Sequence, residues 1–245
     1  GASSTIIDGG NPPSGSPQVP GIDRLFEVVV EGATISISDV TISGGWAAEY
    51  GGAILVSSSS TLAISDSLLT GSVAGKTGGA IDNHAGGVVD LTGSTLSNNY
   101  AAEGGSAINN NLDGVVTIAN STVSSNSAAD VGLNETLVGA GAISNNAEHD
   151  EVGTIVVTDS VIAENRSGSG RHGAGISNDG AGIVNVSDTT FTKNAAMGDG
   201  GGIYNVNGQV TVTGSTFTEN AATNGGGIAS SGDGLVTVSA SSFSK

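Results

Sequence analysis

The sequence contains no cysteine, which excludes a disulfide framework and thiol chemistry. It has only 4 prolines and 3% aromatic residues. No apolar run approaches the roughly 20 residues that span a bilayer, and no signal peptide is visible, so we expect no direct membrane insertion. No helical stripe of apolar residues is present either, which leaves strands as the expected secondary structure.

Basic residues are scarce. The chain has 6 Lys and Arg against 23 Asp and Glu, which gives a net charge of −17. Such a surface repels nucleic acid and anionic lipid, so we expect neither as a partner. The same composition suits solubility outside a cell and favours divalent cations over anions.

What the sequence does contain is a repeat of about 27 residues. One series of apolar residues advances in steps of 27, 27, 27, 39, 29, 26 and 26, and a second, after pairs of glycines, in steps of 27, 27, 35, 33, 27 and 25. Both series lengthen in the same region, so they belong to one repeat unit. The first series is Ile42, Leu69, Leu96, Val123, Ile162, Phe191, Phe217 and Phe243, and the second is Ile54, Ile81, Ile108, Ile143, Ile176, Ile203 and Ile228.

The residues between the two series alternate apolar and polar, as in VTVTGSTFT at 210–218. This alternation predicts three short strands in each repeat. Strands this short cannot bury a face alone, but stacked repeats would pair each strand in parallel with its copy one rung away. We therefore predict an all-β fold, a single-stranded parallel β-helix (a solenoid) of about eight rungs, roughly 40 Å long at about 4.8 Å per rung.

Two columns of asparagine follow the same period. Asparagine tolerates left-handed backbone, and stacked amides can hydrogen-bond along the axis of a solenoid. We interpret both columns as structural ladders. They are Asn83, Asn110, Asn145, Asn178 and Asn205 in one column, and Asn99, Asn126, Asn165, Asn194 and Asn220 in the other.

The repeat divides the chain into two regions. Residues 1–32 depart from it and are expected to form an N-terminal cap, while residues 33–245 form one continuous β-helix domain. The sequence ends just after the core residue Phe243. Solenoids need covered ends, so this predicts a fragment of a longer protein, a further downstream domain, or end-to-end self-association.

The paired motifs GGAI (51–54 and 78–81) and FxxN (191–194 and 217–220) resemble the repeat signature of polymorphic outer-membrane proteins. These are passenger regions of a class of autotransporters, and secreted bacterial right-handed β-helix proteins are similar. The resemblance covers about residues 33–245, with variants in most repeats. It implies a right-handed coil, secretion or display on a bacterial cell surface, and a non-catalytic adhesin or scaffold role. Partners would be host-cell or extracellular glycans or proteins.

The period breaks between Asn126 and Ile143, where a loop is longer than its equivalents. Insertions in a solenoid form surface loops, often on the binding face. With the loop of the next rung, it gathers five candidate ligand-binding residues. In one interpretation they do acid–base work on a sugar polymer, or bind one, at the 130–172 edge; in the other they are surface ion pairs. The five are Asp130, Glu135, Arg166, Arg171 and His172.

A second insertion, AEHDEV at 147–152, supplies Glu148, Asp150 and Glu151. These carboxylates are the best candidates for a Ca²⁺ site, although calcium takes six to eight oxygen ligands. No other cofactor is expected.

Two further features have competing interpretations. Outward Thr and Ser pairs such as Thr95/Ser97 and Thr190/Thr192 resemble the arrays of ice-binding solenoids, but Thr is also an ordinary exposed strand residue. Trp46, Tyr50 and Tyr100 could stack on sugar rings or cover the core beneath them.

Overall fold

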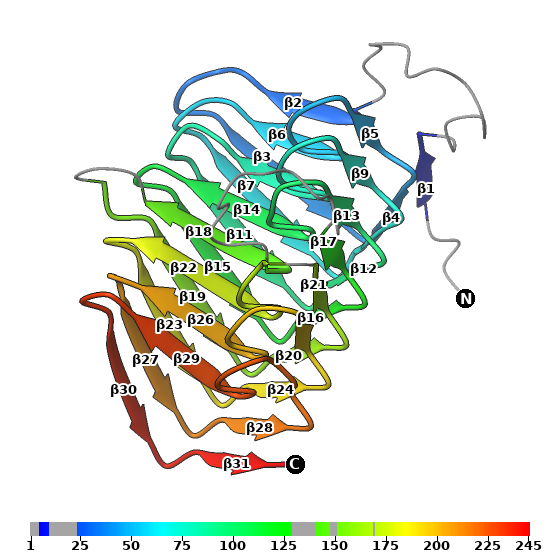
Figure 1. Cartoon of the computed structure of the whole chain (residues 1–245). Helices are drawn as coiled ribbons and strands as arrows, with labels where there is room; N and C mark the ends of the chain where they lie inside the picture. The colour runs from blue at the N-terminus through cyan, green and yellow to red at the C-terminus, as the bar shows by residue number, and fades with distance from the viewer. Residues whose placement is uncertain (1–4, 10–23, 129–140, 148–150, 169) are drawn as a thin grey trace.

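The computed structural model describes residues 5–9, 24–128, 141–147, 151–168 and 170–245. Within these ranges every regular element is a strand, and no helix is long and apolar enough to cross a membrane. Consecutive turns of chain stack along one axis from the first strands to the last (Figure 1). Each turn repeats after roughly 27 residues, as in the register Ile81↔Ile108, which confirms the predicted parallel β-solenoid. The right-handedness of the coil remains an expectation from the family resemblance.

Three long parallel sheets run the length of the coil, and every strand pairs in register with its equivalents in the neighbouring turns. Sheet A contains β1 (Thr5–Asp8), β4 (Val40–Ser43), β8 (Leu68–Thr70), β12 (Thr95–Ser97), β16 (Thr122–Ser124), β20 (Val161–Ala163), β24 (Thr190–Thr192), β28 (Thr216–Thr218) and β31 (Ser242–Ser244). Sheet C contains β2 (Phe26–Val28), β6 (Ile54–Val56), β10 (Ile81–Asn83), β14 (Ile108–Asn111), β18 (Ile143–Ala147), β22 (Ile176–Gly180), β26 (Ile203–Val206) and β29 (Ile228–Ser231). Sheet D contains β3 (Thr34–Ser38), β7 (Thr61–Ser65), β11 (Val88–Thr92), β15 (Val115–Ala119), β19 (Thr154–Thr158), β23 (Ile183–Ser187), β27 (Gln209–Thr213) and β30 (Leu235–Ser239).

A fourth set of two-residue strands forms sheet B, which the sequence pattern did not predict. It lies between sheets A and C in each of six turns. Its strands are β5 (Trp46–Ala47), β9 (Val73–Ala74), β13 (Tyr100–Ala101), β17 (Ser127–Ala128), β21 (Arg166–Ser167) and β25 (Ala195–Ala196).

The core is built from the two apolar series, as predicted. Ile81, Ile108 and Ile143 are fully buried and lie directly over one another in sheet C. Phe191, Phe217 and Phe243 stack with ring centroids 4.5 and 4.6 Å apart. In the last turn the predicted inward positions are open, and Val238 and Phe243 are 43% and 50% exposed. At the other end β1 pairs with β4 and β2 with β6, so the two N-terminal segments each extend a sheet by one strand.

Two corners of each turn are made by a single residue with positive φ. Between sheets D and A this residue has φ of 48–62°, as at Asp66 and Asp188, and between sheets A and B it has φ of 55–66°, as at Asn98 and Lys193. Left-handed backbone favours Gly, Asn and Asp, which explains why these types recur at the corner between sheets D and A. At the corner between sheets A and B the same conformation is also adopted by Ser125, Glu164, Lys193 and Glu219. The first glycine of GGAI also has positive φ, and at Gly51 a Cβ would lie 2.4 Å from the Ile54 carbonyl oxygen. This close contact explains why the first position of the motif requires glycine.

Candidate functional site

The structure describes three of the five residues predicted at the 130–172 edge, and it places Arg166 in different surroundings from Arg171 and His172. Asp130 and Glu135 lie outside the described residues. Arg171 does not face solvent, being only 3% exposed. Its Nη2 donates to the carbonyl oxygen of Ala102 at 3.0 Å, and its Nη1 donates to that of Glu103. Those carbonyls lie in the loop after β13, whereas Arg171 lies in the loop after β21, two strands further along sheet B. The guanidinium therefore joins loops that are not neighbours.

The environment of Arg171 is that of a structural cation. Burial lowers the pKa of its guanidinium, while the charge of Glu103 opposes that shift. Two of its N–H groups are directed at backbone carbonyls and the side chain is almost fully buried, so it is poorly placed to bind a ligand. Its predicted role at a ligand site thus gains no support from the geometry.

His172 is also bonded to the protein. Its Nδ1 accepts a hydrogen bond from the backbone N–H of Asp199 at 2.8 Å, which places the proton of the neutral ring on Nε2. The ring stacks on Tyr204 with centroids 4.3 Å apart and 19° between the planes. This arrangement holds the loop against β26.

Among the three described residues of the five, Arg166 is the one that lies exposed beside a cavity. It lines a half-open groove of about 300 Å³ together with Ser125, Asn126, Ser127, Glu164 and Lys193. We call this the corner groove, because its lining comes from the corners that precede β17, β21 and β25. Arg166 and Arg171 therefore face different surroundings.

The predicted calcium residues are only partly described, since Glu148 and Asp150 lie outside the described ranges. Oε2 of Glu151 is shielded from solvent and has no hydrogen-bond partner. Among the described residues no group of three or more His, Cys, Asp or Glu side chains could hold a metal ion. The Ca²⁺ prediction remains without a described ligand set.

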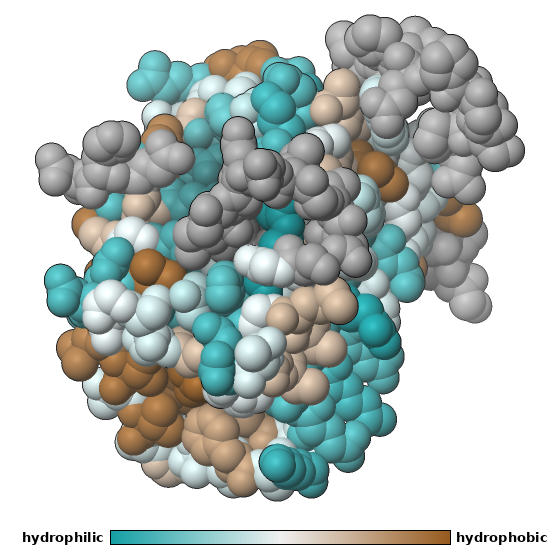
Figure 2. Space-filling model, in the orientation of Figure 1, coloured by the Kyte–Doolittle hydropathy of each residue, from teal (hydrophilic) through white to brown (hydrophobic). Residues whose placement is uncertain are grey.

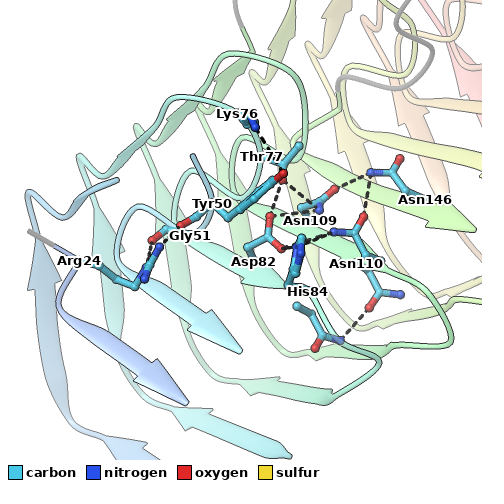
Figure 3. A network of polar contacts seen from close by, with 12 residues as sticks. Arg24, Tyr50, Gly51, Lys76, Thr77, Asp82, His84, Asn109, Asn110 and Asn146 are labelled. Atoms are coloured by element: carbon cyan, nitrogen blue, oxygen red, sulfur yellow. Dashed lines mark hydrogen bonds and ion pairs between the residues drawn. The ribbon is translucent and has the colours of Figure 1, made fainter. Parts of the chain in front are cut away.

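A polar cluster that the sequence did not reveal lies on the outer face of sheet C (Figure 3). At its centre is Asp82, which is fully buried although its side chain points away from the core. Oδ2 of Asp82 accepts hydrogen bonds from Thr77 Oγ1 at 2.5 Å and from Asn109 Nδ2 at 3.1 Å. Oδ1 lies 3.5 Å from Asn111 Nδ2 and 3.4 Å from His84 Nδ1. The carboxylate is therefore saturated with donors.

His84 forms the exposed side of this cluster, with 42% of its side chain accessible. The hydrogen bond with Asp82 raises the pKa of His84, against the opposing effect of partial burial. Tyr50 covers the ring with centroids 4.5 Å apart, and Lys76 bonds to Glu49 at 2.7 Å beside it. An Asp–His pair can hold a proton, but no cysteine exists in the chain, and the Thr77 hydroxyl already donates to Asp82. We find no nucleophile activated by His84 in the described part.

The sequence signal for this cluster was weak. Asp82 pairs with Leu55 in the preceding turn and with Asn109 in the next, so no acidic column marks it, and outward positions on a strand are ordinarily exposed. Asp82 is buried here because the loop after β9 folds over the outer face of sheet C, as the Thr77–Asp82 hydrogen bond shows.

Both asparagine ladders are confirmed. In the first, each Nδ2 donates to the Oδ1 of the next turn at 2.8 Å, from Asn83 through Asn205. In the second, the same bond is 3.0 Å long from Asn99 through Asn220.

A third ladder of hydroxyl groups was missed. Ser94, for example, accepts from the backbone N–H of Ser67 at 3.1 Å and donates to the Thr92 carbonyl at 2.9 Å. The pattern continues through Ser121, Ser160, Thr189 and Ser215. The signal was present in the sequence, since a Ser or Thr follows the corner residue in most repeats.

No family model, curated protein or solved structure matches this chain.

Proposed function

We propose that this chain is an extracellular, surface-displayed β-helix of a bacterial protein that acts as an adhesin or scaffold without catalysis. The observation that carries the proposal is that the Arg171 side chain is already bonded within the protein. This basic residue, predicted at the 130–172 edge, is buried and bonded to the carbonyls of Ala102 and Glu103. His172 likewise accepts from a backbone N–H.

The wider use of polar side chains supports the same proposal. Buried amides and hydroxyls form ladders that run along the axis, so they strengthen stacking between turns and are not free to act on a substrate. A long rigid coil with a charged exterior suits the presentation of surface loops. The GGAI and FxxN motifs, which resemble passenger regions of autotransporters, point to display on a cell surface.

The test is a turnover assay on the purified chain. Soluble polyuronates and neutral glycans would be incubated with calcium or with a chelator, and new reducing ends and unsaturated products measured. We expect no product above that of a heat-denatured sample, together with retained binding to an extracellular glycan or protein target. Turnover by the wild-type chain that is lost in a folded Arg171→Lys variant would replace this proposal with a carbohydrate-active enzyme.

Ice binding is a lesser candidate. Its support is the stacking of Thr95 on Thr122 and of Thr190 on Thr216 in sheet A. Leu68 and Val161 interrupt the column, and hydroxyls bond to one another, as between Ser97 and Thr70 at 3.3 Å. Absence of thermal hysteresis and of ice-crystal shaping would exclude it.

A further inference from the structure

We propose that the corner groove binds an acidic sugar, with its carboxylate held by Arg166 and its hydroxyl groups held by Glu164 and the serines. This inference deepens the proposed adhesin role, because it names a ligand class for a surface that would otherwise only be displayed.

The charges of the molecule single out this groove. Arg24 bonds to Glu27 at 2.9 Å and Lys76 to Glu49 at 2.7 Å, and Arg171 is buried against carbonyls. Arg166, by contrast, is exposed and has no hydrogen bond or ion pair with its guanidinium among the contacts of the described chain. An unpaired, planar guanidinium is suited to bidentate binding of a carboxylate.

Lys193 adds a second cation to the same groove. Its Nζ lies 4.0 Å from Glu219 Oε2, and both side chains are more than half exposed, so that ion pair is weak. The chain has six Lys and Arg residues in all, and two of them line this one groove. Glu164 in the lining and Glu219 beside Lys193 offset these two charges, so the groove is close to neutral and repels an anion less than the rest of a molecule of net charge −17 does.

The floor of the groove is rigid. Ser125, Glu164 and Lys193 occupy equivalent corners in successive turns, with φ of 56°, 57° and 55°. The next residue in each case belongs to the second asparagine ladder, so its side chain and backbone are held by the amides of adjacent turns, as at Asn126 and Asn165. A preorganised site loses less entropy when a ligand binds. Figure 2 shows a hydrophilic band over the ends of β20, β24 and β28, where these corners lie.

The remaining groups favour a sugar over a simple anion. Glu164 repels a second negative charge but accepts hydrogen bonds from hydroxyl groups, and Ser125 and Ser127 can donate or accept. The acidic surface also disfavours polyanions. The ligand that fits has one carboxylate and several hydroxyls. A volume of about 300 Å³ lies at the small end of ligand sites, which suits one or a few sugar units.

The experiment is calorimetric titration of the full chain at low salt with three probes. These are a neutral oligosaccharide that carries a single uronic acid unit (the uronate oligomer), its carboxyl-reduced neutral counterpart (the reduced oligomer), and the reduced oligomer carrying a single sulfate (the sulfated probe). We expect the uronate oligomer to bind and the reduced oligomer to bind at least about 10-fold more weakly, with the affinity falling as salt is added. A preference for the sulfated probe would overturn the carboxylate assignment.

Substitutions of single residues test whether the corner groove is the binding site. Arg166→Gln should weaken uronate binding about 10- to 100-fold, and Lys193→Gln should weaken it less. The matched control Lys76→Gln removes a cation from a distant turn and should leave the affinity unchanged. Unaltered binding by Arg166→Gln, or no uronate binding at all, would overturn the inference.

Failure of the groove inference and failure of the proposed function give different experimental results. Binding to other extracellular targets without uronate binding rejects the groove and leaves the adhesin role. Uronate binding followed by turnover rejects the non-catalytic role and leaves the groove.

Discussion

Asp179 carries a largely buried carboxyl group on β22, on the outer side of sheet C. Its Oδ2 accepts a hydrogen bond from Ser177 Oγ at 3.4 Å, while its Oδ1 is shielded from solvent without a partner. Burial raises the pKa of Asp179 to about 7, and the Ser177 hydroxyl opposes the shift only in part. The folded chain therefore keeps this proton over a pH range in which the unfolded chain has lost it.

The free energy of unfolding depends on pH wherever the folded and unfolded states bind different numbers of protons. Between about pH 4 and pH 7 the unfolded state has released the Asp179 proton and the folded state holds it, so the free energy of unfolding falls as pH rises. Above about pH 7 both states are ionised and this contribution is constant. We predict that Asp179→Asn stabilises the protein by about 2–4 kcal/mol at pH 8 and by little at pH 4.

Urea unfolding of wild type and variant across this range measures the effect. The exposed corner residue Asp188 offers a control, since Asn also tolerates its φ of 48°. The difference between wild type and Asp188→Asn should stay within about 0.5 kcal/mol at every pH. An Asp179→Asn difference independent of pH would show that this carboxyl titrates normally.

Residue-level roles were the part of the site least accessible from sequence. The insertion loops did mark Arg171 and His172 as unusual, because two basic residues in so acidic a chain require an explanation. The spacing of the repeats could not reveal that the Arg171 guanidinium donates to the carbonyls of Ala102 and Glu103, some 70 residues earlier in the chain. Loop contacts depend on side-chain reach and not on periodicity.

At the scale of the element, the strands and the asparagine ladders were predictable because each turn repeats the same pattern of apolar and polar residues. Period-two alternation identifies the strands, and in-register stacking places any repeated polar residue against its copy. The asparagine columns follow directly. Sheet B could not be predicted in this way, because a two-residue strand carries no periodicity. Asp82 was also missed as a buried group, since its cover comes from loops.

The first asparagine ladder has an unfilled end that can be tested. Oδ1 of Asn83 is buried and unpartnered, whereas in the next turns each Oδ1 accepts from the preceding amide. The residue paired with Asn83 in the preceding turn is Val56, which is fully buried. An amide at that position would be placed to donate to Asn83, as Asn83 donates to Asn110.

We therefore predict that Val56→Asn costs less than about 1.5 kcal/mol, although a buried Val→Asn change ordinarily costs about 3 kcal/mol or more. Val157→Asn is the matched control, because Val157 is equally buried in sheet D, where no amide ladder runs. Urea unfolding at pH 7 compares the two. Equal losses would mean that the ladder cannot be extended toward the N-terminus.

At the scale of the whole molecule, the coil stacks like charges along its corners. Asp159 and Asp188 are both exposed and occupy the same corner in consecutive turns, about 4.8 Å apart along the axis. With 23 acidic and 6 basic residues, repulsion of this kind outweighs the few ion pairs. The stacking that builds the core thus also concentrates negative charge.

Screening this repulsion should stabilise the fold. We predict that raising NaCl from 20 to about 500 mM, with a chelator present to exclude divalent ions, increases Tm, because the Debye length falls from more than about 20 Å to less than about 5 Å. Each kcal/mol of relieved repulsion corresponds to about 2–4 °C for a chain of this size. The double variant Asp159→Asn/Asp188→Asn keeps the corner conformation and removes one repelling pair, so its Tm should be higher at low salt and respond less to NaCl. A wild-type Tm that falls with added salt would show instead that surface ion pairs, such as Lys76–Glu49, dominate the electrostatic energy of the coil.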